Sequence, residues 1–174
     1  MIAYGRPVDI MAEIEAATAR LYGTIGRLTD TDARQPSRLP GWTRGHVLTH
    51  IARGGNALRN VLQDAPAYPS QDARDADIEA GAGRTIADLE ADVRASADAF
   101  RAAALTRTDW DAEVSVLGFA PFPTSQLLLR RLVELELHHV DLDAGYRTAD
   151  WSPAFVALDL PEPMRSQRAD RLAW

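Results

Sequence analysis

Imidazole and carboxylate side chains recur at helical spacing in two short stretches of this chain. The first stretch contains His46 and His50, and the second contains Glu134 and His138. Residues four positions apart lie on the same face of an α-helix, so Glu134 and His138 can converge on a single ion. A third ligand from another helix, such as His50, would complete a site of two histidines and one carboxylate. Such a site leaves coordination positions open for chemistry.

The same residues also have a purely structural interpretation. A Glu–His pair at this spacing is usually an ordinary helix pair worth a few tenths of a kcal/mol. His46 and His50 share a face with Arg53 and Asn60 opposite the main apolar stripe of their segment, a pattern typical of a solvated surface. Against this, all four histidines fall within the two stretches, each flanked by apolar sequence. Metal sites in helical bundles are built in this way, from side chains on facing helices.

The composition restricts the chemistry. A length of 174 residues fits one domain, with 46% hydrophobic and 25% charged residues. The net charge of -6 argues against a nucleic-acid partner. The chain has no cysteine, which excludes disulfides, thiolate ligands and a cysteine nucleophile, so any sulfur chemistry needs an external thiol. The absence of lysine, with abundant alanine, is typical of a GC-rich genome such as an actinobacterium's.

Targeting signals are not evident in the sequence. No apolar run approaches the roughly 20 residues that a membrane-spanning helix needs. The first seven residues lack the charged-then-apolar order of a signal peptide. There is also no Gly-rich phosphate loop and no Gly-x-Ser-x-Gly motif. We therefore expect a cytoplasmic protein that does not associate with a membrane.

Hydrophobic periodicity predicts four main helices, at about residues 8–28, 43–62, 85–105 and 124–144. Thr43 can cap the second helix, and Thr85 with Asp88 resembles a capping box for the third. Thr124 or Ser125 can cap the fourth. These helices predict an all-α fold, an antiparallel four-helix bundle with long crossover connections.

The connections are less regular. Residues 64–84 are polar and rich in Ala, Pro, Gly and Asp, so we expect a surface loop there. Residues 109–123 mix aromatic residues with Val, Gly and Pro, and could hold a short hairpin. A last helical segment is expected after Ser152 and Pro153.

The fourth helix carries two polar stripes. Its apolar residues occupy most of the circumference, so we expect it to be buried on several sides. The stripes lie nearly opposite each other: Arg130, Glu134, His138 and Asp141 on one side, and Glu136, His139 and Asp143 on the other. Only one stripe is expected to face solvent, and periodicity does not say which.

Several other side chains could contribute to a site. Trp42, Trp110 and Phe119 could line a pocket, although anchoring of the core is the commoner role of such residues. Arg130 or Arg131 could bind a substrate carboxylate in bidentate fashion, with a surface or interhelical ion pair as the alternative.

Two segments resemble a known family. Residues 39–53, Leu-Pro-Gly-Trp-Thr-Arg-Gly-His-Val-Leu-Thr-His-Ile-Ala-Arg, closely resemble the N-terminal domain of mycothiol-dependent maleylpyruvate isomerases, members of the wider DinB-like superfamily. Residues 131–146, which contain Glu134 and His138, resemble the second motif of that family. The order and separation of the motifs agree with the family, and the resemblance extends from the first helix to about Trp151.

The resemblance implies a four-helix bundle with a metal held by His50, Glu134 and His138. It also implies that the stripe with Glu134 and His138 faces inward. The opposite stripe, with Glu136, His139 and Asp143, would then be structural or exposed. Four further residues would then be neighbours of the metal or contacts of the substrate: Arg53, Asp141, Arg130 and His46.

The implied cofactors are a divalent metal and mycothiol. Two histidines and a glutamate suit zinc, although nickel, cobalt and iron also accept them. A divalent ion lowers the pKa of a thiol and holds it as a thiolate. The thiolate can add to the conjugated double bond of maleylpyruvate and allow rotation about the resulting single bond. When the C–S bond breaks again, the thiolate leaves and the trans product, fumarylpyruvate, remains. The expected partners are thus a small-molecule substrate and the thiol cofactor, with a homodimer as one assembly that the sequence allows.

Full-length isomerases of this kind carry a small C-terminal α/β domain that contributes an arginine near the active site. This chain ends at Trp174, about where that domain would begin, so we expect a single metal-binding domain over residues 1–174. Two other functions therefore stay open. One is a mycothiol S-transferase on the same metal, and the other is a non-catalytic helical module for binding or dimerisation.

Overall fold

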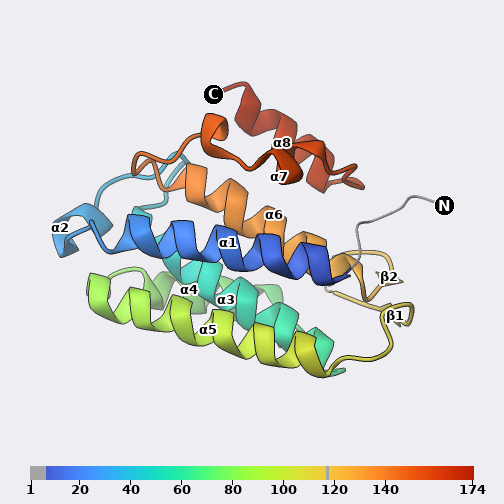
Figure 1. The fold of residues 1–174 in the computed structure, drawn as a ribbon. Coiled ribbons are helices and arrows are strands. Elements are labelled where there is room, and N and C mark those ends of the chain that lie inside the picture. Colours follow the sequence, from blue (N-terminus) through green and yellow to red (C-terminus); the bar gives the residue numbers. More distant parts are fainter. Residues whose placement is uncertain (1–6, 117) are drawn as a thin grey trace.

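Four long helices form the body of the computed structural model, which describes residues 7–116 and 118–174 (Figure 1). They are α1 (Pro7–Ile25), α3 (Arg44–Leu62), α5 (Ile86–Thr106) and α6 (Gln126–Asp141). α3 packs against α5 and α6, and α1 packs against α6. The predicted all-α bundle is confirmed. It contains parallel neighbours as well as antiparallel ones, because α1 and α6 run in one direction and α3 and α5 in the other.

Shorter elements connect and cover the bundle. They are α2 (Asp30–Ala33), α4 (Gln71–Gly81), a 3-10 turn (Thr148–Asp150), α7 (Pro153–Ala157) and α8 (Met164–Leu172). Between α5 and α6 lie two short strands, β1 (Glu113–Val114) and β2 (Phe122–Pro123), which pair antiparallel with Val114 opposite Phe122. The predicted hairpin and the helical segment after Pro153 are therefore present.

α6 lies at the centre of the packing. α1, α3 and α8 all contact it, and Leu127, Leu128 and Leu129, which point to three different sides of the helix, are almost completely buried. This arrangement explains the nearly continuous apolar circumference of the helix, because each neighbour needs an apolar surface to pack against. The expectation that α6 is buried on several sides is confirmed.

The helix caps follow the sequence at two of three places. The Thr43 side chain accepts a hydrogen bond from the His46 backbone, and Thr85 caps α5 through the Asp88 backbone. The predicted cap of α6 is wrong, because Ser125 already has helical backbone angles and makes no capping bond. The Thr124 hydroxyl instead donates to the Ala112 carbonyl at 2.8 Å, which fastens the hairpin.

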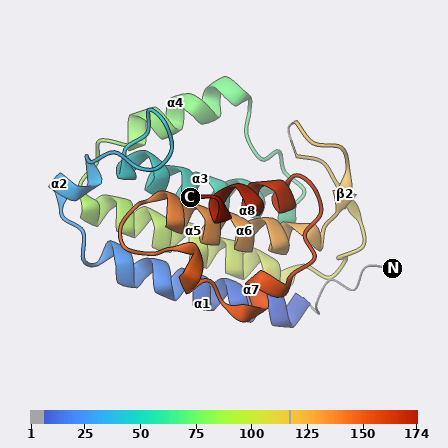
Figure 2. The same ribbon diagram turned by 90° about the horizontal axis from the view of Figure 1, so that it is seen from above.

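The surface loop predicted for residues 64–84 is wrong, because this segment contains α4. Ser70 caps the helix, and Ile78 is buried against the bundle. A single large apolar side chain in eleven residues gives too little periodicity to reveal a helix. Figure 2 shows α4 beside α3, and α8 above α6, so these two short helices cover neighbouring parts of the bundle.

Within residues 7–116 and 118–174, no helix combines the length and the apolar character needed to cross a membrane.

Candidate functional site

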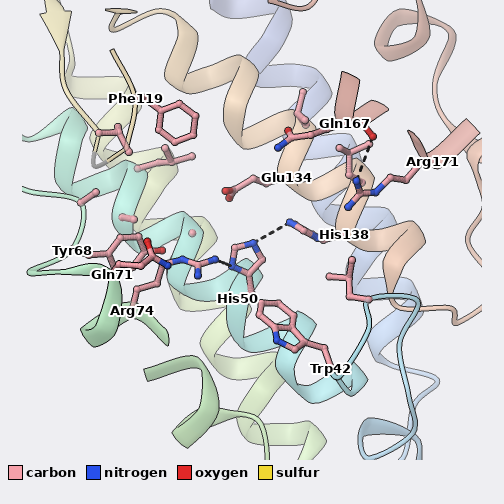
Figure 3. A pocket seen from close by; sticks show the side chains of 18 residues that line it. Trp42, His50, Tyr68, Gln71, Arg74, Phe119, Glu134, His138, Gln167 and Arg171 are labelled. Carbon is pink, nitrogen blue, oxygen red and sulfur yellow. Dashed lines mark hydrogen bonds between the residues drawn. The ribbon is translucent and has the colours of Figure 1, made fainter. Parts of the chain in front are cut away.

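A cavity of about 490 Å³ lies between α3 and α6 (Figure 3). α3 contributes His50, and α6 contributes Glu134 and His138. α4 adds Arg74 from one side, and α8 adds Arg171 from the other. All three predicted metal ligands therefore line one cavity, and two helices that periodicity did not reveal complete its wall.

The two histidines meet inside this cavity. Their Nε2 atoms are 2.9 Å apart, and the rings pack edge to face. Arg74 Nη2 lies 3.1 Å from His50 Nδ1, and His138 Nδ1 lies 2.8 Å from Asp141 Oδ2. Because arginine can only donate, His50 Nδ1 accepts, and its Nε2–H donates to His138 Nε2. His138 then donates its Nδ1–H to Asp141, so its Nε2 presents a lone pair.

Asp141 holds His138 in this orientation. The carboxylate is buried and also accepts two hydrogen bonds from Arg171, at 3.1 Å from Nε and 2.9 Å from Nη2. Burial by itself would raise the pKa of Asp141, but the hydrogen bonds from His138 and Arg171 outweigh it and keep the pKa below its usual value. A carboxylate behind a histidine fixes the ring and its tautomer, as is common around metal-binding histidines.

His50 is almost fully enclosed. Its burial, followed by the proximity of His138 and Arg74, lowers the pKa of His50 well below the usual value of 6.5. Trp42 covers the ring edge-on, with the ring centroids 5.6 Å apart. His50 is therefore neutral at physiological pH, the form in which imidazole can bind a metal.

Two adjacent glycines of α3 make room for charged side chains of α6. The Glu134 carboxylate lies against Gly54, where an added Cβ would overlap it, and the Arg131 guanidinium lies against Gly55. Arg131 is fully buried and donates to the Ile51 carbonyl at 2.9 Å. Glu134 Oε2 is buried and has no hydrogen-bond partner. Burial lowers the pKa of Arg131, and Glu134 acts in the opposite direction, so the two charges interact.

The chemical groups of His50, Glu134 and His138 are of the types that bind a divalent metal. Two imidazoles and a carboxylate oxygen without a partner supply the nitrogen and oxygen ligands that zinc accepts. However, no three His, Cys, Asp or Glu side chains in the described part of the chain are already arranged to hold an ion. The structure brings His50, Glu134 and His138 into one cavity, and their role as ligands stays a prediction.

Three other candidate residues do not line this cavity. His46 contacts Thr43 at the start of α3 and reaches Glu79 of α4 at 3.1 Å. Arg53 pairs with Asp77 and Asp92, which fastens α3 to α4 and α5. Arg130 stacks over Phe119 and Phe122, with its guanidinium 4.4 and 4.1 Å from the ring centroids. Of the aromatic candidates, Trp42 and Phe119 line the cavity and Trp110 packs against the core.

The opposite stripe of α6 is structural. Glu136 is buried and accepts hydrogen bonds from Arg20 and from the Tyr146 hydroxyl. His139 is also buried; it contacts Thr24 Oγ1 at 2.8 Å and stacks on Tyr146. The expectation that one stripe faces solvent is wrong for these residues, because α1 covers this side of α6, and only Asp143 at its end is exposed.

Sequence reasoning did not find the cavity residues of α4 and α8. Arg74, Tyr68 and Gln71 lie in the segment expected to be a loop, and Gln167 and Arg171 lie in a helix that was not expected. Tyr68 is enclosed enough that burial, assisted by Glu134, raises its pKa to about 12. None of these residues stands at a spacing that distinguishes it from a surface residue.

Comparison with known proteins places the chain in a family. The model of the mycothiol maleylpyruvate isomerase N-terminal domain matches residues 14–143. The chain belongs to this family. The matched residues contain the cavity-lining parts of α3, α4 and α6, whereas α8 lies beyond them.

Solved structures show the same fold as this family member. A mycothiol-dependent maleylpyruvate isomerase superposes with a TM-score of 0.83 at 23% identity, and a histidine-to-alanine mutant of such an enzyme with 0.82 at 22%. Each match covers 87% of this chain and 67% of the other. At these identities the likeness establishes the fold. No curated protein sequence gives a significant match.

Proposed function

We propose that this chain is a metal-dependent enzyme that uses mycothiol for cis–trans isomerisation of a maleylpyruvate-like substrate. The observation that carries the proposal is the 2.9 Å approach of His50 Nε2 to His138 Nε2, in a cavity where Glu134 has a buried oxygen without a partner. The family model spans all three residues. The family is named for mycothiol and for the isomerisation of maleylpyruvate, and the proposal takes its thiol and its reaction class from that name.

His50, Glu134 and His138 are the residues that would hold the metal. When bound, a divalent ion such as zinc supplies Lewis acidity that lowers the pKa of a thiol and keeps it ionised. Asp141, supported by Arg171, holds the His138 ring so that Nε2 remains available for a ligand. The chain has no thiol of its own, which is consistent with the use of an external one.

The cavity offers suitable surroundings for a small electrophile. Its volume of about 490 Å³ lies in the usual range of small-molecule sites. Leu58, Val133 and Phe119 form an apolar part of the wall, which lowers the local polarity around a bound substrate. A carboxylate of the substrate would be attracted to the positive charges of Arg74 and Arg171 on the two sides of the cavity.

Metal content tests the first part of the proposal. We expect the purified protein to hold about one divalent ion per chain, and His50→Ala to lose it. His46→Ala is the matched control, because His46 lies one turn earlier on the same helix and outside the cavity. If the protein holds no divalent metal and His50→Ala changes nothing, the enzyme is ruled out, and a binding or dimerisation module is left.

The reaction is tested by incubation with mycothiol and maleylpyruvate, with the formation of fumarylpyruvate as the readout. We expect conversion that depends on the thiol and is lost in His50→Ala. Conjugation of mycothiol to an electrophile, without any cis–trans conversion, would assign the protein as an S-transferase on the same metal and refute the isomerase.

A further inference from the structure

We infer that Arg74 and the metal compete for His50, so that metal loading releases the Arg74 guanidinium to bind a carboxylate within the cavity. This inference rests on the proposed role of His50 as a metal ligand. The His50 imidazole would thus exchange one partner, Arg74, for another, the metal. Arg74 of α4 would become an anion-binding residue whose availability depends on the metal.

The competition follows from the hydrogen-bond chemistry of the His50 ring. Arg74 Nη2 lies 3.1 Å from His50 Nδ1 (Figure 3), and a guanidinium can only donate, so Nδ1 must carry a lone pair. A neutral imidazole has one N–H, which therefore lies on Nε2 and faces His138 Nε2. A metal at Nε2 requires the other tautomer, with the proton on Nδ1. That tautomer offers Arg74 no acceptor.

When this hydrogen bond is lost, Arg74 keeps a contact with the neutral Tyr68 hydroxyl, which is not a charged partner. Its other charged contact is Asp75 at 2.6 Å, the adjacent residue on α4, whose side chain is 57% exposed. Such an exposed pair contributes little. Arg171 on the opposite wall is already bound to Asp141, so Arg74 is the cavity arginine that metal binding would free.

A freed guanidinium has the geometry to bind a carboxylate through two parallel N–H donors. The ligand class is therefore a small carboxylate that enters the cavity beside the metal. Metal and carboxylate should then bind cooperatively, because each favours the state in which Arg74 has left His50. By thermodynamic linkage, each must raise the affinity of the other by the same factor.

Zinc titrations of the metal-free protein, with and without succinate as the carboxylate probe, test this coupling. We expect succinate to tighten zinc binding by the wild type by about tenfold. Arg74→Gln should bind zinc more tightly than the wild type without succinate and should not respond to it. The inference is overturned if succinate acts equally on both proteins.

Arg53→Gln controls for the loss of positive charge. Arg53 lies on α3 three residues after His50 but pairs with Asp77 and Asp92 instead of the ring. This variant should keep the succinate response and change zinc affinity less than Arg74→Gln does. Equal changes in both variants would mean that Arg74 acts through its charge alone, which would overturn the competition.

Nitrogen-15 NMR of the histidine rings gives an independent readout. In the metal-free wild type we expect the His50 proton on Nε2, and on Nδ1 after zinc is added. A proton on Nδ1 in the metal-free protein would refute the inference while leaving the proposed metal site intact. Zinc binding that is unaffected by His50→Ala would overturn the proposed site, and the inference with it.

Discussion

The absence of two side chains on α3 matters as much as the presence of the histidines. Gly54 follows His50 by one turn, and the Glu134 carboxylate fills the space that a Cβ would occupy. A Cβ at Gly55 would press closely on the Arg131 guanidinium, 3.1 Å from its Cζ. Glycine costs a helix about 1 kcal/mol relative to alanine, and here it lets two opposite charges of α6 enter beside the candidate ligands.

At this scale we predict that Gly54→Ala folds but binds zinc at least tenfold more weakly. The new Cβ would displace the end of a flexible Glu134 side chain, which costs the fold little, whereas alanine favours the helix. Zinc titration and thermal melting are the measurements. Gly83→Ala is the control, because a Cβ there meets nothing within 4 Å. Unchanged zinc affinity in Gly54→Ala would show that Glu134 does not need this position.

Among the elements, α8 supports the site from outside the four long helices. It packs on α6, and its Arg171 reaches the buried Asp141 that holds His138. The family model ends at residue 143, so this support comes from a part of the chain outside the matched domain. α4 plays the corresponding role on the other side through Arg74 and His50.

We predict that Arg171→Gln lowers the free energy of unfolding by about 3 kcal/mol, because Asp141 would remain buried without its cationic partner. Zinc affinity should fall by about tenfold, since the carboxylate behind His138 would be held less firmly. Urea unfolding and zinc titration test these values. Arg165→Gln on the same helix removes only an exposed pair with Glu162 and should change neither. Identical behaviour of the two variants would contradict this role of α8.

For the whole molecule, the polar groups between α1 and α6 are part of the core. Arg20 and the Tyr146 hydroxyl both donate hydrogen bonds to Glu136 there, and His139 is enclosed beside them. Burial, followed by the charge of Arg20, lowers the pKa of His139 from 6.5 to about 3. The folded protein therefore keeps this histidine neutral over a pH range in which the unfolded chain would bind a proton.

We predict that acidification destabilises the protein through His139. Between about pH 3 and 6.5 the unfolded chain binds more protons, so stability falls as the pH falls, by at most about 1.4 kcal/mol per pH unit from this residue. Urea unfolding between pH 7 and 5 measures the slope. In His139→Gln the slope should decrease by up to one proton. A wild-type slope in His139→Gln would exclude this histidine as the cause.

The sequence by itself determined the features that depend on local spacing. The ranges of α1, α3, α5 and α6 follow from apolar periodicity, and the caps at Thr43 and Thr85 from a hydroxyl before a helix. Residue types at helical spacing also indicated which imidazoles and carboxylates could share a face. The family motifs then selected His50, Glu134 and His138, and the structure brings these three to one cavity.

Only the tertiary structure decided what surrounds these residues. Periodicity places a side chain around its own helix axis, but the environment of that side chain depends on which distant segments cover the face. α1 therefore made Glu136 and His139 structural, and α4 and α8 supplied Arg74 and Arg171. α4 has too few apolar residues to be recognised alone, because packing against α3 supplies the stability that its own sequence pattern lacks.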